Sequence, residues 1–80
     1  MSPIKNRDMW IAFGDGFAAA ARAWIATPRE YRTVGHLRSG MRAFLRARDC
    51  FHRAGLGGLA ERHRQSAELM AELAARRRWQ

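Results

Sequence analysis

The spacing of apolar residues predicts a first helix over residues 7–26. Large apolar side chains and alanines recur there every three or four positions, and at 100° per residue they fall in one stripe. The members of this stripe are Trp10, Phe13, Phe17, Ala20, Ala21 and Trp24, with Ile25 at its edge. Asp15 and Arg22 fall on the opposite side. We expect the stripe to face the core.

Two glycines interrupt this pattern, because Gly14 and Gly16 each weaken a helix by about 1 kcal/mol relative to alanine. Either they permit the close approach of another helix, or Asp15 begins the helix and the residues before it form a separate extended piece. We favour one continuous helix, with Asn6 as its N-cap.

The segment Thr27-Pro28-Arg29-Glu30 matches a capping box, in which threonine and a glutamate three residues later bond to each other's backbone amides. It predicts a second helix over residues 28–54. The apolar stripe of this helix comprises Tyr31, Val34, Leu37, Met41, Phe44 and Leu45, with Phe51 at its margin. Gly35 and Gly40 are candidates for close packing against the first helix.

Gly55 is expected to end the second helix in a left-handed conformation, with Leu56 folding back onto it. A third helix is predicted over residues 59–77. Its stripe is thin and therefore suits packing on one neighbour; the members are Leu59, His63, Ser66, Leu69, Met70 and Leu73.

These elements predict one all-α domain over residues 1–80, a helical hairpin with a third packed helix and no sheet. The core is small, since fifteen of the apolar residues are alanine. We therefore expect support from a partner or from a homodimer.

The net charge of +8 is concentrated in the middle of the chain, where residues 28–54 hold seven arginines and two acidic residues. Such a surface suits an anionic partner, although a solvated face that keeps a small protein soluble is the plainer interpretation. The candidate partner-binding residues are Arg32, Arg38, Arg42, Arg46 and Arg53 on the second helix, and Arg76, Arg77 and Arg78 near the end of the chain.

The sequence offers little catalytic chemistry, and we expect no enzyme, no cofactor and no metal. Cys50 and His52 lie about 200° apart on a helix, which prevents joint ligation of a metal. We interpret Cys50 as a half-buried thiol and His63 as an interface histidine. The glycines at 55, 57 and 58 follow a helix and lack the Lys-Ser/Thr of a phosphate-binding loop.

The aromatic side of the first helix is either core or, where the other helices leave it uncovered, an apolar docking surface formed by Trp10, Phe13, Phe17 and Trp24. Integral membrane insertion is not expected, because the most apolar window, residues 9–26, contains two glycines and two charges. Without a recognisable signal peptide, a cytoplasmic location is the expectation.

These features favour a non-catalytic protein of the accessory-subunit, regulator or inhibitor type, which docks on a protein complex through its arginine-lined helix. The alternative is binding of a nucleic-acid backbone without sequence readout. A peripheral membrane-surface helix ranks third.

Overall fold

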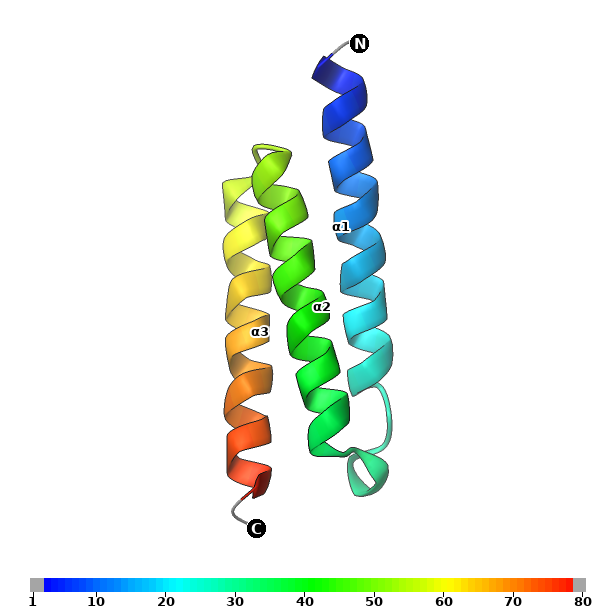
Figure 1. Ribbon diagram of the computed structural model, residues 1–80, viewed down its shortest axis with the longest axis vertical. Helices are drawn as coiled ribbons and strands as arrows, with labels where there is room; N and C mark the ends of the chain where they lie inside the picture. Colours follow the sequence, from blue (N-terminus) through cyan, green and yellow to red (C-terminus); the bar gives the residue numbers. More distant parts are fainter. Residues whose placement is uncertain (1–2, 79–80) are drawn as a thin grey trace.

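The computed structural model describes residues 3–78, and the side chains of residues 6–77. It contains three α-helices and one 3-10 turn: α1 (Pro3–Ile25), η1 (Arg29–Tyr31), α2 (Val34–Arg53) and α3 (Gly57–Arg78). The described part of the chain has no strand, and the predicted all-α, three-helix fold is confirmed. The helices lie side by side and alternate in direction, with α2 in the middle (Figure 1).

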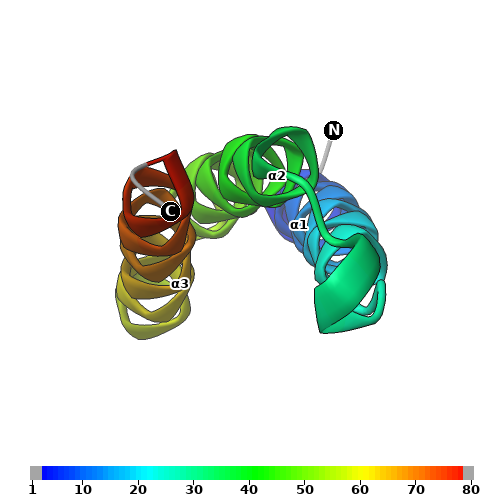
Figure 2. The ribbon, with the colours of Figure 1, turned by 90° about the horizontal axis from the view of Figure 1, so that it is seen from below.

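The helices form an open arch. α1 and α3 pack on opposite flanks of α2, which occupies the apex when the molecule is viewed along its long axis (Figure 2). The molecule measures 51 × 18 × 13 Å, and the first turns of α1 project beyond the α2–α3 turn (Figure 1). The prediction that the third helix packs on one neighbour is correct.

α1 is continuous through both glycines, as predicted. A Cβ atom on Gly14 would lie 2.9 Å from the ring of Phe51, so this glycine permits close packing of α1 on α2. Gly16 faces open space. The predicted N-cap is wrong: Asn6 lies inside the helix, which begins at Pro3.

The stripe of α1 that faces α2 differs in part from the predicted one: Phe17 and Ala21 pack against the core as predicted. Its fully buried members are small, namely Gly14, Ala18 and Ala21, and Ile11 and Ile25 are partly buried on the same side. Phe13 and Trp24 are instead 51% and 44% exposed. Small side chains let two helices approach closely, and the bulky rings are then displaced to the edge of the contact. Hydrophobicity alone ranks phenylalanine and tryptophan above glycine, which explains the error.

The second helix begins at Val34, so the capping box predicted at Thr27 is wrong. The Thr27 hydroxyl donates to the Trp24 carbonyl at the end of α1, and Pro28 is extended. The true N-cap is Thr33, whose hydroxyl accepts from the His36 amide while His36 Nδ1 accepts from the Thr33 amide, both at 3.1 Å. Histidine thus performs the task that the sequence pattern assigned to glutamate.

The turn between α2 and α3 forms as predicted. Gly55 has φ +79°, the Leu56 amide donates to the Phe51 carbonyl, and the Gly55 amide donates to the His52 carbonyl. These two bonds define a Schellman motif. α3 then starts at Gly57, two residues before the predicted position.

The core is centred on Leu37, Phe44 and Phe51 of α2, with alanines from α1 and α3 closing over them. Gly40 packs against Ile25, as expected, whereas Gly35 is exposed. The His63 ring lies 4.8 Å from that of Phe51, and its Nδ1 donates to the Leu59 carbonyl. The predicted interface histidine is therefore confirmed. Cys50 is buried rather than half-buried.

Candidate functional site

Aromatic residues of α1 meet basic residues of α2 along one side of the molecule. Trp10, Phe17 and Trp24 recur every seven residues, so they lie on the same edge of α1. Arg46 and Arg53 of α2 are also seven residues apart. Because the two helices are antiparallel, the two repeats come into register.

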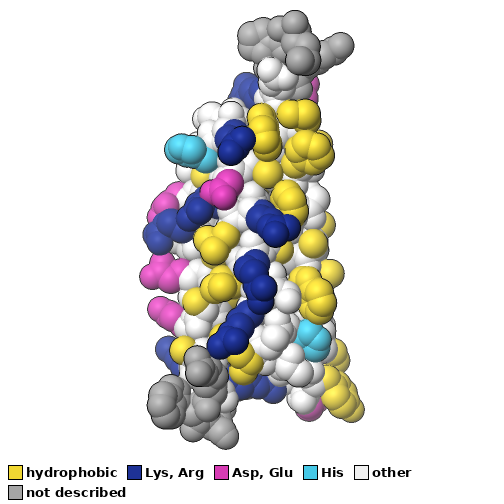
Figure 3. Space-filling view, in the orientation of Figure 1, with side chains coloured by type: hydrophobic (Ala, Val, Ile, Leu, Met, Phe, Trp, Pro, Cys, Tyr) yellow, Lys and Arg dark blue, Asp and Glu magenta, His cyan; other side chains and the backbone are white. Residues whose placement is uncertain are grey.

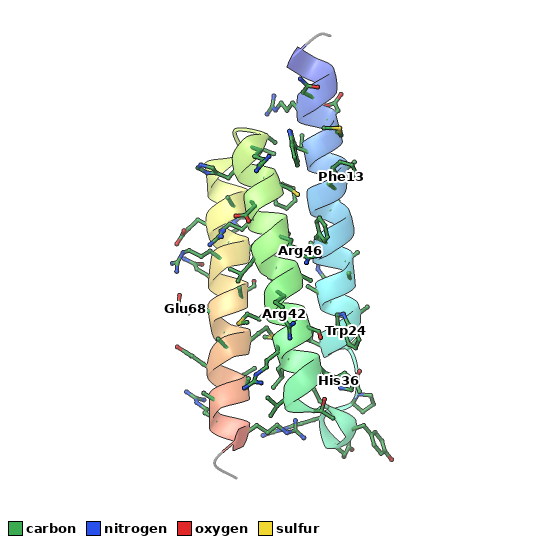
Figure 4. The ribbon with its side chains drawn as sticks, in the orientation of Figure 1. Phe13, Trp24, His36, Arg42, Arg46 and Glu68 are labelled. Atoms are coloured by element: carbon green, nitrogen blue, oxygen red, sulfur yellow. The ribbon has the colours of Figure 1, made fainter. Side chains whose placement is uncertain are left out.

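The contacts in this row are short. The guanidinium carbon of Arg53 lies 4.8 Å from the centre of the Trp10 ring, and that of Arg46 lies 5.8 Å from the centre of the Phe17 ring. These are cation–π distances, and each exposed contact of this kind is worth about 0.5–1 kcal/mol. At the end of the row, the centre of the Trp24 ring lies 5.5 Å from the centre of the His36 ring (Figure 4).

We call this surface the aromatic–arginine strip; its members are Trp10, Phe13, Phe17 and Trp24 of α1, and Arg42, Arg46 and Arg53 of α2. In the space-filling view a line of basic side chains follows α2, with hydrophobic side chains of α1 beside it (Figure 3). Between Phe17 and Trp24 the strip contains an open hollow of about 300 Å³, which Arg42 and Arg46 also line.

The three arginines of the strip have no carboxylate partner among the residues whose side chains are described. The ion pairs found there join Arg48 to Asp49, and Arg64 to Glu61 and Glu68. The bond from Arg64 lowers the pKa of the Glu61 carboxyl. The flank of α3 is thus neutralised internally, whereas the strip keeps its positive charge.

The structure separates the predicted basic residues into two groups. Arg32, Arg76 and Arg77 do not join the strip. Arg32 follows η1, outside α2, and its guanidinium donates twice to the Thr27 carbonyl, at 3.2 and 3.3 Å. Together with Arg29 these residues line a separate pocket between η1 and the end of α3.

Two predicted residues lie elsewhere. Arg38 is exposed and lines an open hollow between α2 and α3, beside Arg42 and Ala71. Arg78 ends α3, and its side chain lies outside the described residues. Sequence reasoning missed Arg29 and His36 as site residues. Both depend on the 3-10 turn and the cap at Thr33, which the sequence pattern replaced with a longer helix.

Within residues 6–77, no group of three or more His, Cys, Asp or Glu side chains is arranged to hold a metal ion. None of the helices in the described part of the chain has the length and apolarity needed to cross a membrane. The strip offers partly exposed aromatic side chains, guanidinium groups without a described carboxylate partner, and a shallow hollow.

The chain matches no known protein-family model, no curated protein and no solved structure.

Proposed function

We propose that this protein is a non-catalytic docking protein that binds an acidic segment of a larger protein through the aromatic–arginine strip. The observation that carries the proposal is the row of cation–π pairs without carboxylate partners, next to exposed Phe13 and Trp24. Aromatic residues and arginine are the side chains most enriched at the energetic centres of protein interfaces.

The stacked arrangement suits such a partner for a physical reason. A guanidinium group held over an aromatic ring has lost part of its conformational freedom before binding, so less entropy is lost when it pairs with a carboxylate. The hollow between Phe17 and Trp24 would receive an apolar side chain of the partner, flanked by its acidic residues. An accessory subunit, regulator or inhibitor acting in the cytoplasm fits this mode of binding.

Capture from the native lysate with and without nuclease, at about 0.3 M salt to screen long-range charge, tests the proposal. We expect a defined protein to survive nuclease treatment. Arg46→Glu and Trp24→Ala should each weaken its binding by tenfold or more, because the first reverses a charge and the second removes an anchor on the same surface.

The matched controls are Arg62→Glu and Leu69→Ala, which alter an exposed arginine and a 51% exposed apolar residue of α3. They should leave binding within about twofold of the wild type. Equal losses in all four variants would contradict a role for the strip. If the only protein captured is a second, differently tagged copy of this chain, the strip is a homodimer interface.

Nucleic-acid binding is the second candidate, since Arg42, Arg46 and Arg53 extend over about 16 Å of one helix without neutralisation. In that case binding is lost on nuclease treatment, and each arginine removed flattens the salt dependence by about one unit. A blue shift of tryptophan emission with anionic vesicles would instead favour peripheral membrane binding.

A further inference from the structure

Four arginines from three segments of the chain surround one pocket at the end of the molecule where α2 begins. Arg29 belongs to η1, Arg32 follows it, and Arg76 and Arg77 lie in the last turns of α3. The pocket has a volume of about 520 Å³, and its apolar lining comes from Leu37 and Leu73. Seen from below, η1 and the end of α3 flank the start of α2 (Figure 2).

Two of the four guanidinium groups are fixed by the backbone. Arg77 donates to the Arg29 carbonyl at 3.0 Å, a bond that joins α3 to η1. Arg32 donates to the Thr27 carbonyl with both Nε and Nη2. Each guanidinium carries five N–H donors, so both retain free donors after these bonds.

The side chains of Arg29 and Arg76 make no hydrogen bond within the described part of the chain, and none of the four arginines forms an ion pair there. Four positive charges around one hollow repel one another. Cations do favour the C-terminus of α3, where the helix dipole is negative, but Arg77 already bonds at this end. The remaining positive charge would attract an anion.

We propose that this pocket binds a ligand with two or more adjacent phosphate groups. A single carboxylate carries one negative charge and accepts one guanidinium fork well, whereas adjacent phosphates offer several charges and enough oxygens for four arginines. The volume is within the usual range for small-ligand sites. The arginines converge on a hollow rather than extending in a line, which favours a compact oligophosphate over a nucleic-acid backbone.

This site is distinct from the aromatic–arginine strip and does not depend on the proposed docking function. The free form of the ligand would be an inorganic oligophosphate, and the conjugated form a nucleotide whose base rests on Leu37 and Leu73. Both present the same chemistry to the arginines.

Calorimetric titration at about 0.15 M salt with inorganic pyrophosphate, orthophosphate and ADP tests the proposal. We expect pyrophosphate to bind at least tenfold more tightly than orthophosphate. ADP binding as tight as that of pyrophosphate identifies a nucleotide, and binding of pyrophosphate alone identifies the inorganic form. Either outcome supports the site.

The informative variants are Arg29→Gln and Arg76→Gln, because they remove charge without breaking any of the hydrogen bonds that hold the pocket together. Each should weaken pyrophosphate binding about tenfold, while the helical circular-dichroism signal stays unchanged. Arg62→Gln is the control for net charge, and Arg46→Gln is the control for the strip.

Absence of pyrophosphate binding at about 1 mM, with Arg29→Gln and Arg76→Gln altering only thermal stability, would overturn the proposal in favour of a structural role. An equal loss of affinity in Arg62→Gln or Arg46→Gln would overturn it too, since binding would then follow net charge. Failure to capture a docking partner would contradict only the proposed function of the strip, because the pyrophosphate titration tests the pocket separately.

Discussion

Gly14 and Gly16 lie two residues apart in α1, but a methyl group at each would meet different surroundings. At Gly14 it would lie 2.9 Å from two ring atoms of Phe51, whose side chain is 2% exposed and therefore unable to yield freely. At Gly16 it would meet nothing within 4 Å. Substitution of Gly16 by alanine therefore tests helix propensity alone, whereas substitution of Gly14 also tests the packing of α1 on α2.

We predict that Gly14→Ala destabilises the protein by about 1–3 kcal/mol, because overpacking outweighs the gain in helix propensity. Gly16→Ala should stabilise it by up to about 1 kcal/mol. Urea unfolding followed by circular dichroism measures both. Stabilisation by both substitutions would mean that α1 and α2 pack less closely at Gly14 than a 2.9 Å approach to the Phe51 ring implies.

A second prediction at the scale of the residue concerns Cys50 and the pH dependence of stability. Burial raises the pKa of its thiol, and the carboxylate of Asp49 adds to the rise. A raised folded-state pKa contributes stability that is present below the ordinary thiol value of 9.0 and is lost as pH rises through the folded-state pKa.

The wild type should therefore lose stability more steeply than Cys50→Ala above about pH 9. Thermal unfolding of both proteins between about pH 7 and 10 provides the comparison. Parallel profiles would show that the thiol ionises as easily in the folded as in the unfolded chain. The native thiol should also react slowly with an aromatic disulfide reagent, because only the thiolate attacks.

At the scale of the elements, the caps decide where the helices begin. Thr27 and Thr33 both precede segments that suit a helix, and the sequence pattern favoured Thr27 because Pro28 and Glu30 follow it. The structure uses Thr33, and the eight residues from Ala26 to Thr33 form the connection in which the chain reverses direction between α1 and α2. Tertiary packing thus overrides a strong local signal.

Thr33→Ala should cost about 1 kcal/mol of stability, because it removes the hydroxyl that accepts from the His36 amide. Thr27→Ala should cost less, since its exposed hydroxyl donates to a carbonyl at the end of α1. Chemical denaturation of the two variants distinguishes the caps. A larger loss of stability in Thr27→Ala than in Thr33→Ala would favour the longer second helix that the sequence predicted.

At the scale of the whole molecule, α2 packs against both flanking helices, and the arch has a Cα radius of gyration of 13.9 Å. A compact chain of this length would have a radius of about 12 Å. This openness leaves the large aromatics of α1 partly exposed and produces both the strip and the arginine pocket.

Small-angle scattering at low concentration should give a radius of gyration near 13.9 Å, the value for the open arch. A value of about 12 Å would indicate that α1 and α3 close onto each other in solution. A radius that rises with concentration would indicate self-association through the exposed apolar surface.

The amino-acid sequence by itself determined the all-α class, three helices, the left-handed stop at Gly55 and the position of His63 at an interface. These features follow from periodicity and from the backbone freedom of glycine, which act over a few neighbouring residues. Only the tertiary structure decided which side of α1 faces α2, where α2 begins and how the arginines divide between two surfaces. Those outcomes depend on which side chains fit between helices and on where the chain must turn, and local pattern contains neither.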